Sequence, residues 1–214
     1  MHVFQREFIE FAIAQGALCF GEFTLKSGRI SPYFFNSGLF NDGDSLRRLG
    51  RYYRQAIEQA KLGFDMLFGP AYKGIPLATA VAISYAAEQT RSVPYCFDRK
   101  EEKDHGEGGL TLGAPLIGRV LLIDDVITAG TSLRLSRQII LAAGAEPVGI
   151  AIALDRQERG QGDLSAIQEI EQEYGMEVIR IISLDNLIEY LQSRSDMTSH
   201  LTKINDYRQQ YGIN

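Results

Sequence analysis

The feature that most constrains the fold is a series of short apolar runs that lack period-2 alternation. Strands of this kind are expected in a sheet that is covered on both faces. Helical segments separate most of the runs, and this repetition predicts a mostly parallel, doubly wound α/β sheet with right-handed crossovers. Ligands of such sheets bind at the carboxyl ends of the strands, so functional residues are expected where the apolar runs stop. The runs are Met66–Phe68, Val93–Phe97, Val120–Ile123, Val148–Leu154 and Val178–Ile182.

The residues before the first run follow another pattern. The N-terminal MHVFQREFIEFAIAQG predicts an amphipathic helix that ends at Gly16. Residues 21–40 contain short β-favouring runs broken by glycine and proline, which predicts an antiparallel hairpin. Helical spacing resumes at Asp42, and Gly63 is expected to cap that helix.

Composition excludes several classes of protein. A chain of 214 residues with 45% hydrophobic and 23% charged residues is typical of one globular domain, 1–214. The net charge of −5 gives no general attraction to nucleic acid. Two cysteines without CxxC spacing indicate neither a disulfide framework nor a zinc site. Charged residues interrupt the apolar residues of the N-terminal helix, which is not typical of a signal peptide. The longest weakly polar stretch, 75–87, is shorter than the ~20 residues of a membrane span. We therefore expect a soluble, cytoplasmic protein.

The most informative motif is RVLLIDDVITAGTSL, residues 119–133, in which an apolar strand runs into Asp124 and Asp125. Small residues from 128 to 132 then precede a helical stretch, and such residues let backbone N–H groups converge on an anion at a helix N-terminus. The motif has the spacing of neither a Walker A loop nor a dinucleotide-binding fingerprint. Two adjacent carboxylates suit the vicinal hydroxyls of a ribose. In the alternative interpretation, the acids only cap the helix and face solvent.

Three further segments carry candidate residues. GPAYKG, residues 69–74, follows the first apolar run. Its glycines would allow close approach of a ligand, and Lys73 would bind a polyphosphate. In the alternative interpretation, the segment is an ordinary turn. RKEEKDHGEGG, residues 99–109, has no apolar anchor and predicts a mobile loop, either a charged lid or a merely solvated one. Arg156 follows the run 148–154, where it could bind a carboxylate through two hydrogen bonds or form a salt bridge with Asp155 or Glu158.

Residues 119–133 resemble the signature of type I phosphoribosyltransferases that binds 5-phospho-α-D-ribosyl 1-diphosphate (PRPP). Four other segments resemble the orotate-using members of this family: 24–38, 68–78, 99–109 and 153–160. The resemblance covers nearly the whole chain. It implies the family's α/β sheet, a small N-terminal hood (about 1–40) over the carboxyl edge of the sheet, and a mobile catalytic loop (about 98–111). It also implies a non-proline cis peptide within GPAYKG.

The same resemblance implies the reaction and the partners. The ribosyl 5-phosphate group of PRPP would be transferred to orotate, giving orotidine 5′-monophosphate (OMP) and pyrophosphate. Mg²⁺ would be required and held mainly by PRPP and water, without a dedicated protein metal site. The chain would form a homodimer whose catalytic loops reach into the neighbouring site. Neither nucleic acid nor membrane is an expected partner.

The resemblance also assigns residues. Catalytic roles fall to Asp124, Asp125, Arg99, Lys100, Lys103 and His105. Contacts with PRPP fall to Lys26, Tyr72, Lys73, Arg99, Lys100, Lys103, His105, Asp124, Asp125, Val126, Ile127, Thr128, Ala129, Gly130, Thr131 and Ser132. Contacts with orotate fall to Lys26, Phe34, Phe35, Thr128 and Arg156, although two adjacent phenylalanines are usually hydrophobic filler.

Two other functions share part of this pattern. The same fold could act on a purine or on uracil, but a buried Arg156 would then lack the carboxylate that pairs with it. A PRPP-responsive regulator of nucleic acid would keep the phosphate site without catalysis. Such a protein should carry a DNA-binding segment or a basic face, and the sequence indicates neither.

Overall fold

The computed structural model describes the backbone of residues 1–103, 109–127, 130–160 and 162–213. The predicted site residues His105, Thr128 and Ala129 lie outside these ranges. The helices are α1 (Val3–Ala14), α2 (Gly43–Ala60), α3 (Gly74–Gln89), α4 (Thr131–Ala142), α5 (Ala166–Tyr174), α6 (Leu184–Gln192) and α7 (Thr198–Tyr211). The strands are β1 (Leu18–Thr24), β2 (Ile30–Phe35), β3 (Met66–Gly69), β4 (Tyr95–Lys103), β5 (Gly109–Gly113), β6 (Arg119–Ile123), β7 (Glu146–Asp155) and β8 (Glu177–Ser183).

The central sheet has the strand order β5-β4-β3-β6-β7-β8, and only β5 runs antiparallel to its neighbour. The chain leaves β3 towards β4 on one side and returns to β6 on the other. This reversal between two adjacent parallel strands is the topological switch point at which doubly wound sheets bind ligands. The segments that follow β3 and β6 are GPAYKG and DDVITAGTS, so the topology brings the two predicted phosphate-binding segments together.

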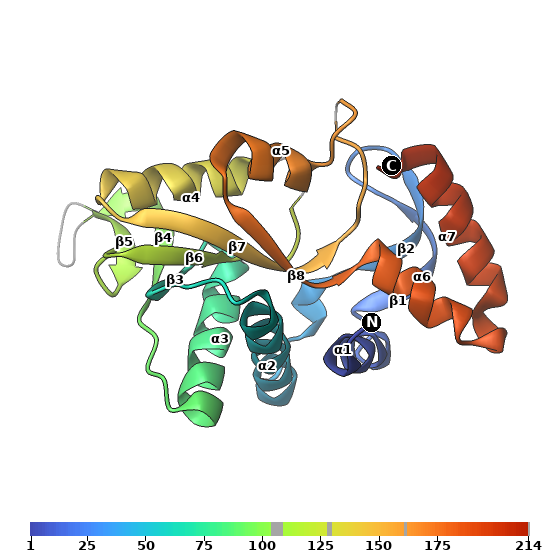
Figure 1. The fold of residues 1–214 in the computed structure, drawn as a ribbon, viewed down its shortest axis with the longest axis horizontal. Coiled ribbons are helices and arrows are strands. Elements are labelled where there is room, and N and C mark those ends of the chain that lie inside the picture. The colour runs from blue at the N-terminus through green and yellow to red at the C-terminus, as the bar shows by residue number, and fades with distance from the viewer. Residues whose placement is uncertain (104–108, 128–129, 161, 214) are drawn as a thin grey trace.

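Helices cover both faces of the sheet, with α2 and α3 on one face and α4 and α5 on the other (Figure 1). Alternate strand residues enter two separate cores. Leu67 and Leu121 join the core beneath α2 and α3, whereas Phe68 and Leu122 join the one beneath α4 and α5. All four are buried, which explains why the runs lack polar alternation and confirms the predicted fold class.

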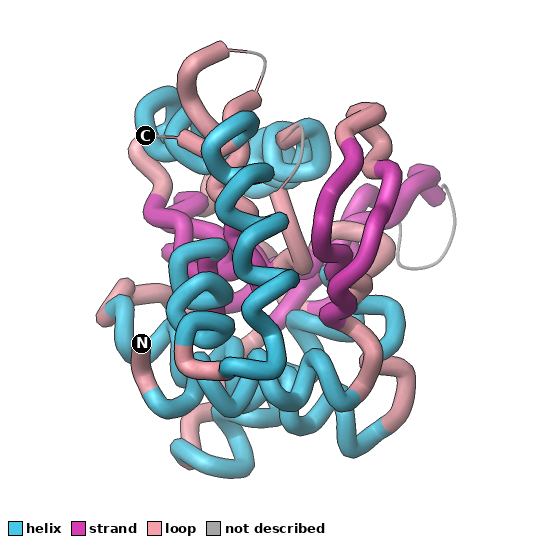
Figure 2. Tube along the Cα trace, turned by 90° about the vertical axis from the view of Figure 1, so that its right-hand side faces the viewer, coloured by secondary structure: helices cyan, strands magenta, loops and turns pink. Residues whose placement is uncertain are grey.

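The N-terminal hairpin forms a separate antiparallel sheet of β1 and β2, with Leu18 opposite Phe35. Figure 2 shows this ribbon next to α7, which packs on β2. The hood is therefore built from both ends of the chain. The contribution of α7 is not predictable from the pattern of residues 1–40, because this helix reaches the hairpin only through long-range packing.

Two local predictions differ from the structure. Residues 98–111 were expected to form a loop, but β4 continues to Lys103 and β5 begins at Gly109. The two strands pair as a ribbon at the edge of the sheet, where backbone hydrogen bonds require no apolar side chains. Helix α2 ends with Lys61 in the left-handed conformation, before the expected cap Gly63.

In the described part of the chain, no helix is long and apolar enough to span a membrane.

Candidate active site

Asp124 and Asp125 follow β6 at the switch point and differ in their surroundings. Asp125 is buried, and its Oδ2 accepts hydrogen bonds from Ser37 Oγ (2.6 Å) and Lys73 Nζ (2.7 Å). Its Oδ1 accepts from the Val126 backbone N–H at 2.9 Å. Ser37 belongs to the hood and Lys73 to the segment after β3, so three parts of the chain converge on one carboxylate.

Asp124 is half-buried beside it. Burial and the neighbouring Asp125 raise the pKa of Asp124 from 3.8 to about 7. Its backbone N–H donates to the Ala151 carbonyl (3.0 Å), and its carbonyl accepts from the Tyr53 hydroxyl (2.7 Å). The backbone is thus fixed by β7 and α2, while the side-chain Oδ1 accepts a hydrogen bond from the Asp125 backbone N–H at 2.9 Å. The N-cap of α4 is Gly130, and Asp125 is held by partners far along the chain, so the interpretation of the pair as only a local helix cap is wrong.

The GPAYKG segment carries Lys73 to Asp125 and contains the expected cis peptide, between Ala71 and Tyr72. Asp98 of β4 is buried and accepts a hydrogen bond from the Ala71 backbone N–H. Tyr72 is exposed. The Lys73 side chain is 57% exposed despite its ion pair, so the ammonium is accessible to an anion.

The glycines of this segment are also needed for packing within the chain. A Cβ on Gly69 would meet the carbonyl of Gly74. A Cβ on Gly74 would lie 2.8 Å from the carbonyl oxygen of Ile123, at the end of β6. The two glycines therefore let the segment pack against itself and against the strand that carries Asp124.

Helix α4 begins after the second of the two predicted phosphate-binding segments. Its N-cap is Gly130 in the left-handed conformation (φ 68°), a residue that has no side chain with which to cap the helix. Neither acid nor capping side chain occupies the first turn, and Thr131 and Ser132 are exposed. The first N–H groups of this helix are thus suited to bind an anion. Val126 and Ile127 precede it and are half-buried.

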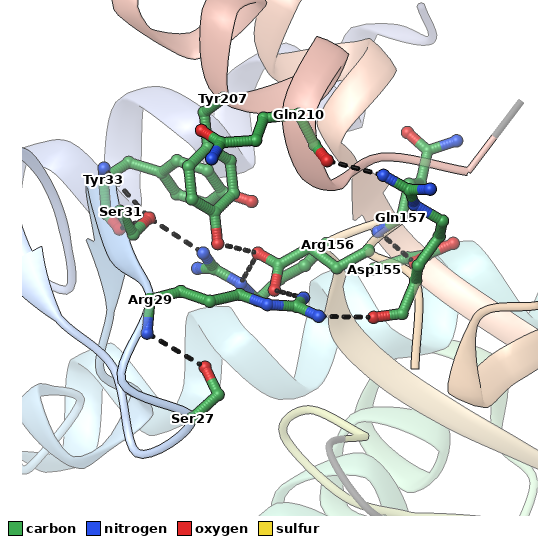
Figure 3. Close-up of polar contacts among 11 residues, drawn as sticks. Ser27, Arg29, Ser31, Tyr33, Asp155, Arg156, Gln157, Tyr207 and Gln210 are labelled. Carbon is green, nitrogen blue, oxygen red and sulfur yellow. Dashed lines mark hydrogen bonds and ion pairs between the residues drawn. The ribbon is translucent and has the colours of Figure 1, made fainter. Parts of the chain in front are cut away.

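Arg156 lies beyond β7 and faces the hood (Figure 3). Its side chain is 16% exposed. Nε donates to Glu158 (2.7 Å), one terminal nitrogen donates to Ser31 Oγ (2.9 Å), and the guanidinium carbon lies 4.2 Å from the centre of the Tyr33 ring. Of the two predicted salt-bridge alternatives, the one with Glu158 is present. Asp155 pairs instead with Arg180 at 2.9 Å.

The remaining predicted residues take varied positions. Phe34 is exposed and stacks on Phe23 (5.5 Å between ring centres), whereas Phe35 turns inward towards Phe40. Lys26 is exposed in the turn between β1 and β2. Arg99 lies in β4, with one buried guanidinium nitrogen that contacts no hydrogen-bond partner among the described residues. The backbones of Lys100 and Lys103 lie in the same strand.

Sequence reasoning missed Ser37, Tyr53 and Asp98. Tyr53 has the helical spacing of a core residue, and nothing in its neighbours distinguishes its hydroxyl from an ordinary buried one. Ser37 and Asp98 meet their partners only through the tertiary fold.

Among the described residues, no group of three or more His, Cys, Asp or Glu side chains is arranged to hold a metal ion.

Comparison with known proteins agrees with this geometry. A family model described as phosphoribosyl transferase domain matches residues 38–178. The orotate phosphoribosyltransferases of Thioalkalivibrio sulfidiphilus and Pseudomonas aeruginosa are 62% and 59% identical to this chain over 213 residues, and each alignment covers 100% of both proteins. The crystal structure of orotate phosphoribosyltransferase from Francisella tularensis is 44% identical, with a TM-score of 0.88 over 96% of this chain and 99% of that one. This chain belongs to the orotate phosphoribosyltransferases, within the phosphoribosyl transferase domain family.

Proposed function

We propose that this enzyme transfers the ribosyl 5-phosphate group from PRPP to orotate, giving OMP and pyrophosphate. The observation that carries the proposal is the convergence of Asp124, Asp125 and Lys73 at the switch point, in front of the uncapped start of α4. Arg156 lies at the same edge of the sheet, under the hood. One edge therefore offers groups for a sugar, for phosphates and for a carboxylate.

The groups of PRPP divide among these residues by chemistry. Asp124 and Asp125 accept hydrogen bonds from the ribose hydroxyls, and residues 126–132 bind the 5′-phosphate through backbone N–H groups. Tyr72 and Lys73 bind pyrophosphate, together with the catalytic-loop residues Arg99, Lys100, Lys103 and His105. The 57% exposure of Lys73 supports this role, because its ammonium can contact phosphate oxygens while it stays near Asp125.

The orotate site lies between the hood and the loop after β7. Arg156 binds the carboxylate, while Lys26, Phe34, Phe35 and Thr128 surround the base. In the reaction the bond between ribose C1 and the pyrophosphate oxygen breaks, and a bond from C1 to the base nitrogen forms. The transition state resembles a ribosyl cation, so catalysis consists of positioning both substrates, neutralising the departing pyrophosphate and excluding water.

Mg²⁺ fits this site as an ion held mainly by its substrate. Asp125 already accepts hydrogen bonds at both oxygens, which leaves Asp124 as the more accessible carboxylate. Magnesium commonly takes one or two carboxylates and completes its shell with phosphate and water, so Asp124 would be the protein residue nearest to the ion. The bound ion would neutralise negative charge on pyrophosphate.

The proposal includes a homodimer in which the catalytic loop of one subunit serves the site of the other, within a single domain, 1–214. It also places the enzyme in the cytoplasm. The free thiols of Cys19 and Cys96 support that location, because reduced cysteines persist in a reducing compartment.

The test mixes purified protein, PRPP and Mg²⁺ with orotate and follows the loss of orotate absorbance, with uracil and hypoxanthine in parallel reactions. We expect turnover of orotate alone. Turnover of hypoxanthine without turnover of orotate would refute the proposed substrate while leaving the PRPP site in place.

A further inference from the structure

The Arg156 guanidinium lies in a cluster that draws on three separate parts of the chain. Glu158 accepts from Arg156 Nε through Oε1 and from Arg29 through Oε2, at 2.7 Å and 3.4 Å. The hydroxyl of Tyr207, in α7, donates to Glu158 Oε1 at 3.0 Å. Glu158 is 14% exposed, so these contacts are largely shielded from water. Figure 3 shows Arg29, Arg156 and Tyr207 directed towards one another.

The cluster holds Arg156 from several directions. Glu158 fixes Nε, Ser31 fixes one terminal nitrogen, and the Tyr33 ring lies against the guanidinium plane. These hydrogen bonds use Nε and one of the two terminal nitrogens of the guanidinium. A fixed guanidinium binds a carboxylate at a smaller entropic cost than a mobile one, because its orientation is already set.

The charges of the cluster do not cancel. Arg29 and Arg156 supply two positive charges against the single negative charge of Glu158. Arg29 thus offsets Glu158, and one positive charge remains for a ligand. Burial, with Glu158 close by, raises the pKa of Tyr207 to about 12, so its hydroxyl keeps the proton that it donates.

Helix α7 is itself attached to the loop that carries Glu158. The Arg159 backbone N–H donates to the Tyr211 carbonyl (2.9 Å), and the Ile213 N–H donates to the Gln157 carbonyl (3.0 Å). The Tyr207 ring also packs edge-on against Tyr33, with 6.4 Å between ring centres. Movement of α7 would therefore shift Glu158 and the Tyr33 platform together.

We propose that Tyr207 is a positioning residue for substrate recognition: from helix α7 it orients Glu158, and through Glu158 it holds Arg156 ready for the carboxylate of the base. This inference rests on the proposed role of Arg156 in binding orotate. Tyr207 need not contact the substrate. Its effect is confined to ligands that carry the carboxylate.

The experiment compares Tyr207→Phe, which removes only the hydroxyl, with Tyr211→Phe on the same helix. Tyr211 is the matched control because its ring packs against Tyr207 and Arg29, and its contact with Arg159 is made by its backbone carbonyl. Dissociation constants are measured for OMP and for uridine 5′-monophosphate (UMP), which differ only in the carboxylate. Kinetic constants for orotate and PRPP are measured in parallel.

Loss of one hydrogen bond corresponds to about 1 kcal/mol, or about fivefold in affinity. We expect Tyr207→Phe to raise both the dissociation constant for OMP and the KM for orotate by about fivefold. The dissociation constant for UMP and the KM for PRPP should be unchanged. Tyr211→Phe should change none of these values. In a Glu158→Ala background, Tyr207→Phe should add no further loss, because both changes break the same chain of contacts.

Equal weakening of OMP and UMP binding in Tyr207→Phe would identify a purely structural role, and unchanged affinity for both ligands would remove the role altogether. Either result overturns the inference while the proposed activity stands. A wild-type enzyme that binds OMP no tighter than UMP would instead overturn the assignment of Arg156, and the positioning role with it.

Discussion

Replacement of Asp124 by Asn should stabilise the protein at neutral pH while it weakens catalysis. In the folded protein, burial and Asp125 raise the pKa of Asp124 from 3.8 to about 7. The folded state therefore binds this proton more tightly than the unfolded state does. The resulting stabilisation is fully present below pH 3.8 and is lost as the pH rises through about 7. The asparagine side chain does not ionise in this range, so the free energy of unfolding of the variant increases relative to that of the wild type as the pH increases.

The pKa values set the size of the effect. Between pH 5 and pH 8, the free energy of unfolding of the variant should increase relative to wild type by roughly 2–3 kcal/mol. For a domain of this size, that difference corresponds to about 5–10 °C in Tm. Turnover should fall strongly at every pH, because the variant lacks a carboxylate that is proposed to bind the ribose hydroxyls.

The assay is urea unfolding, followed by circular dichroism at pH 5 and at pH 8, without ligands. Asp206→Asn is the control, because Asp206 is an exposed carboxylate on α7. Its stability difference from wild type should be the same at both pH values. If the difference for Asp124→Asn is also the same at both, Asp124 ionises like an ordinary surface carboxylate and the argument from burial is wrong.

Three further predictions address packing, specificity and assembly. Gly74→Ala should lower the free energy of unfolding by about 1–3 kcal/mol, since the new Cβ meets the Ile123 carbonyl; unchanged urea midpoints would contradict this. Arg156→Ala should raise the KM for orotate at least tenfold and leave the KM for PRPP unchanged, because truncation of one partner of a buried charge pair costs about 2–5 kcal/mol of binding free energy. A change of less than threefold in the KM for orotate would make Arg156 structural. Asp125→Asn and Lys103→Ala should each be inactive, yet subunit exchange between them should restore roughly a quarter of wild-type activity, because each mixed dimer then contains one intact site. No recovery after exchange, confirmed with mass-tagged chains, would remove the shared-site proposal.

Much of the fold follows from local sequence patterns. The runs 66–68, 120–123 and 148–154 predict strands because each is buried on both faces, and the structure places β3, β6 and β7 there. Asp124 and Asp125 could be identified because the motif around them is continuous: strand, acids, small residues and helix occur within 15 residues. The hairpin at 21–40 was predictable from its turn residues in the same way.

The partners of the site residues could not be predicted in this way. Lys73 reaches Asp125 only because β3 and β6 are neighbours in the sheet, although 52 positions separate the two residues. Helix α7 contributes Tyr207 to the cluster around Arg156 only because it packs on β2. The sequence by itself determined which strands this chain would have and which segments are candidates for phosphate binding, since both depend on neighbouring residues. Tertiary structure decided which charges meet, because the pairing of distant side chains depends on the order of the strands and on how both ends of the chain pack over them.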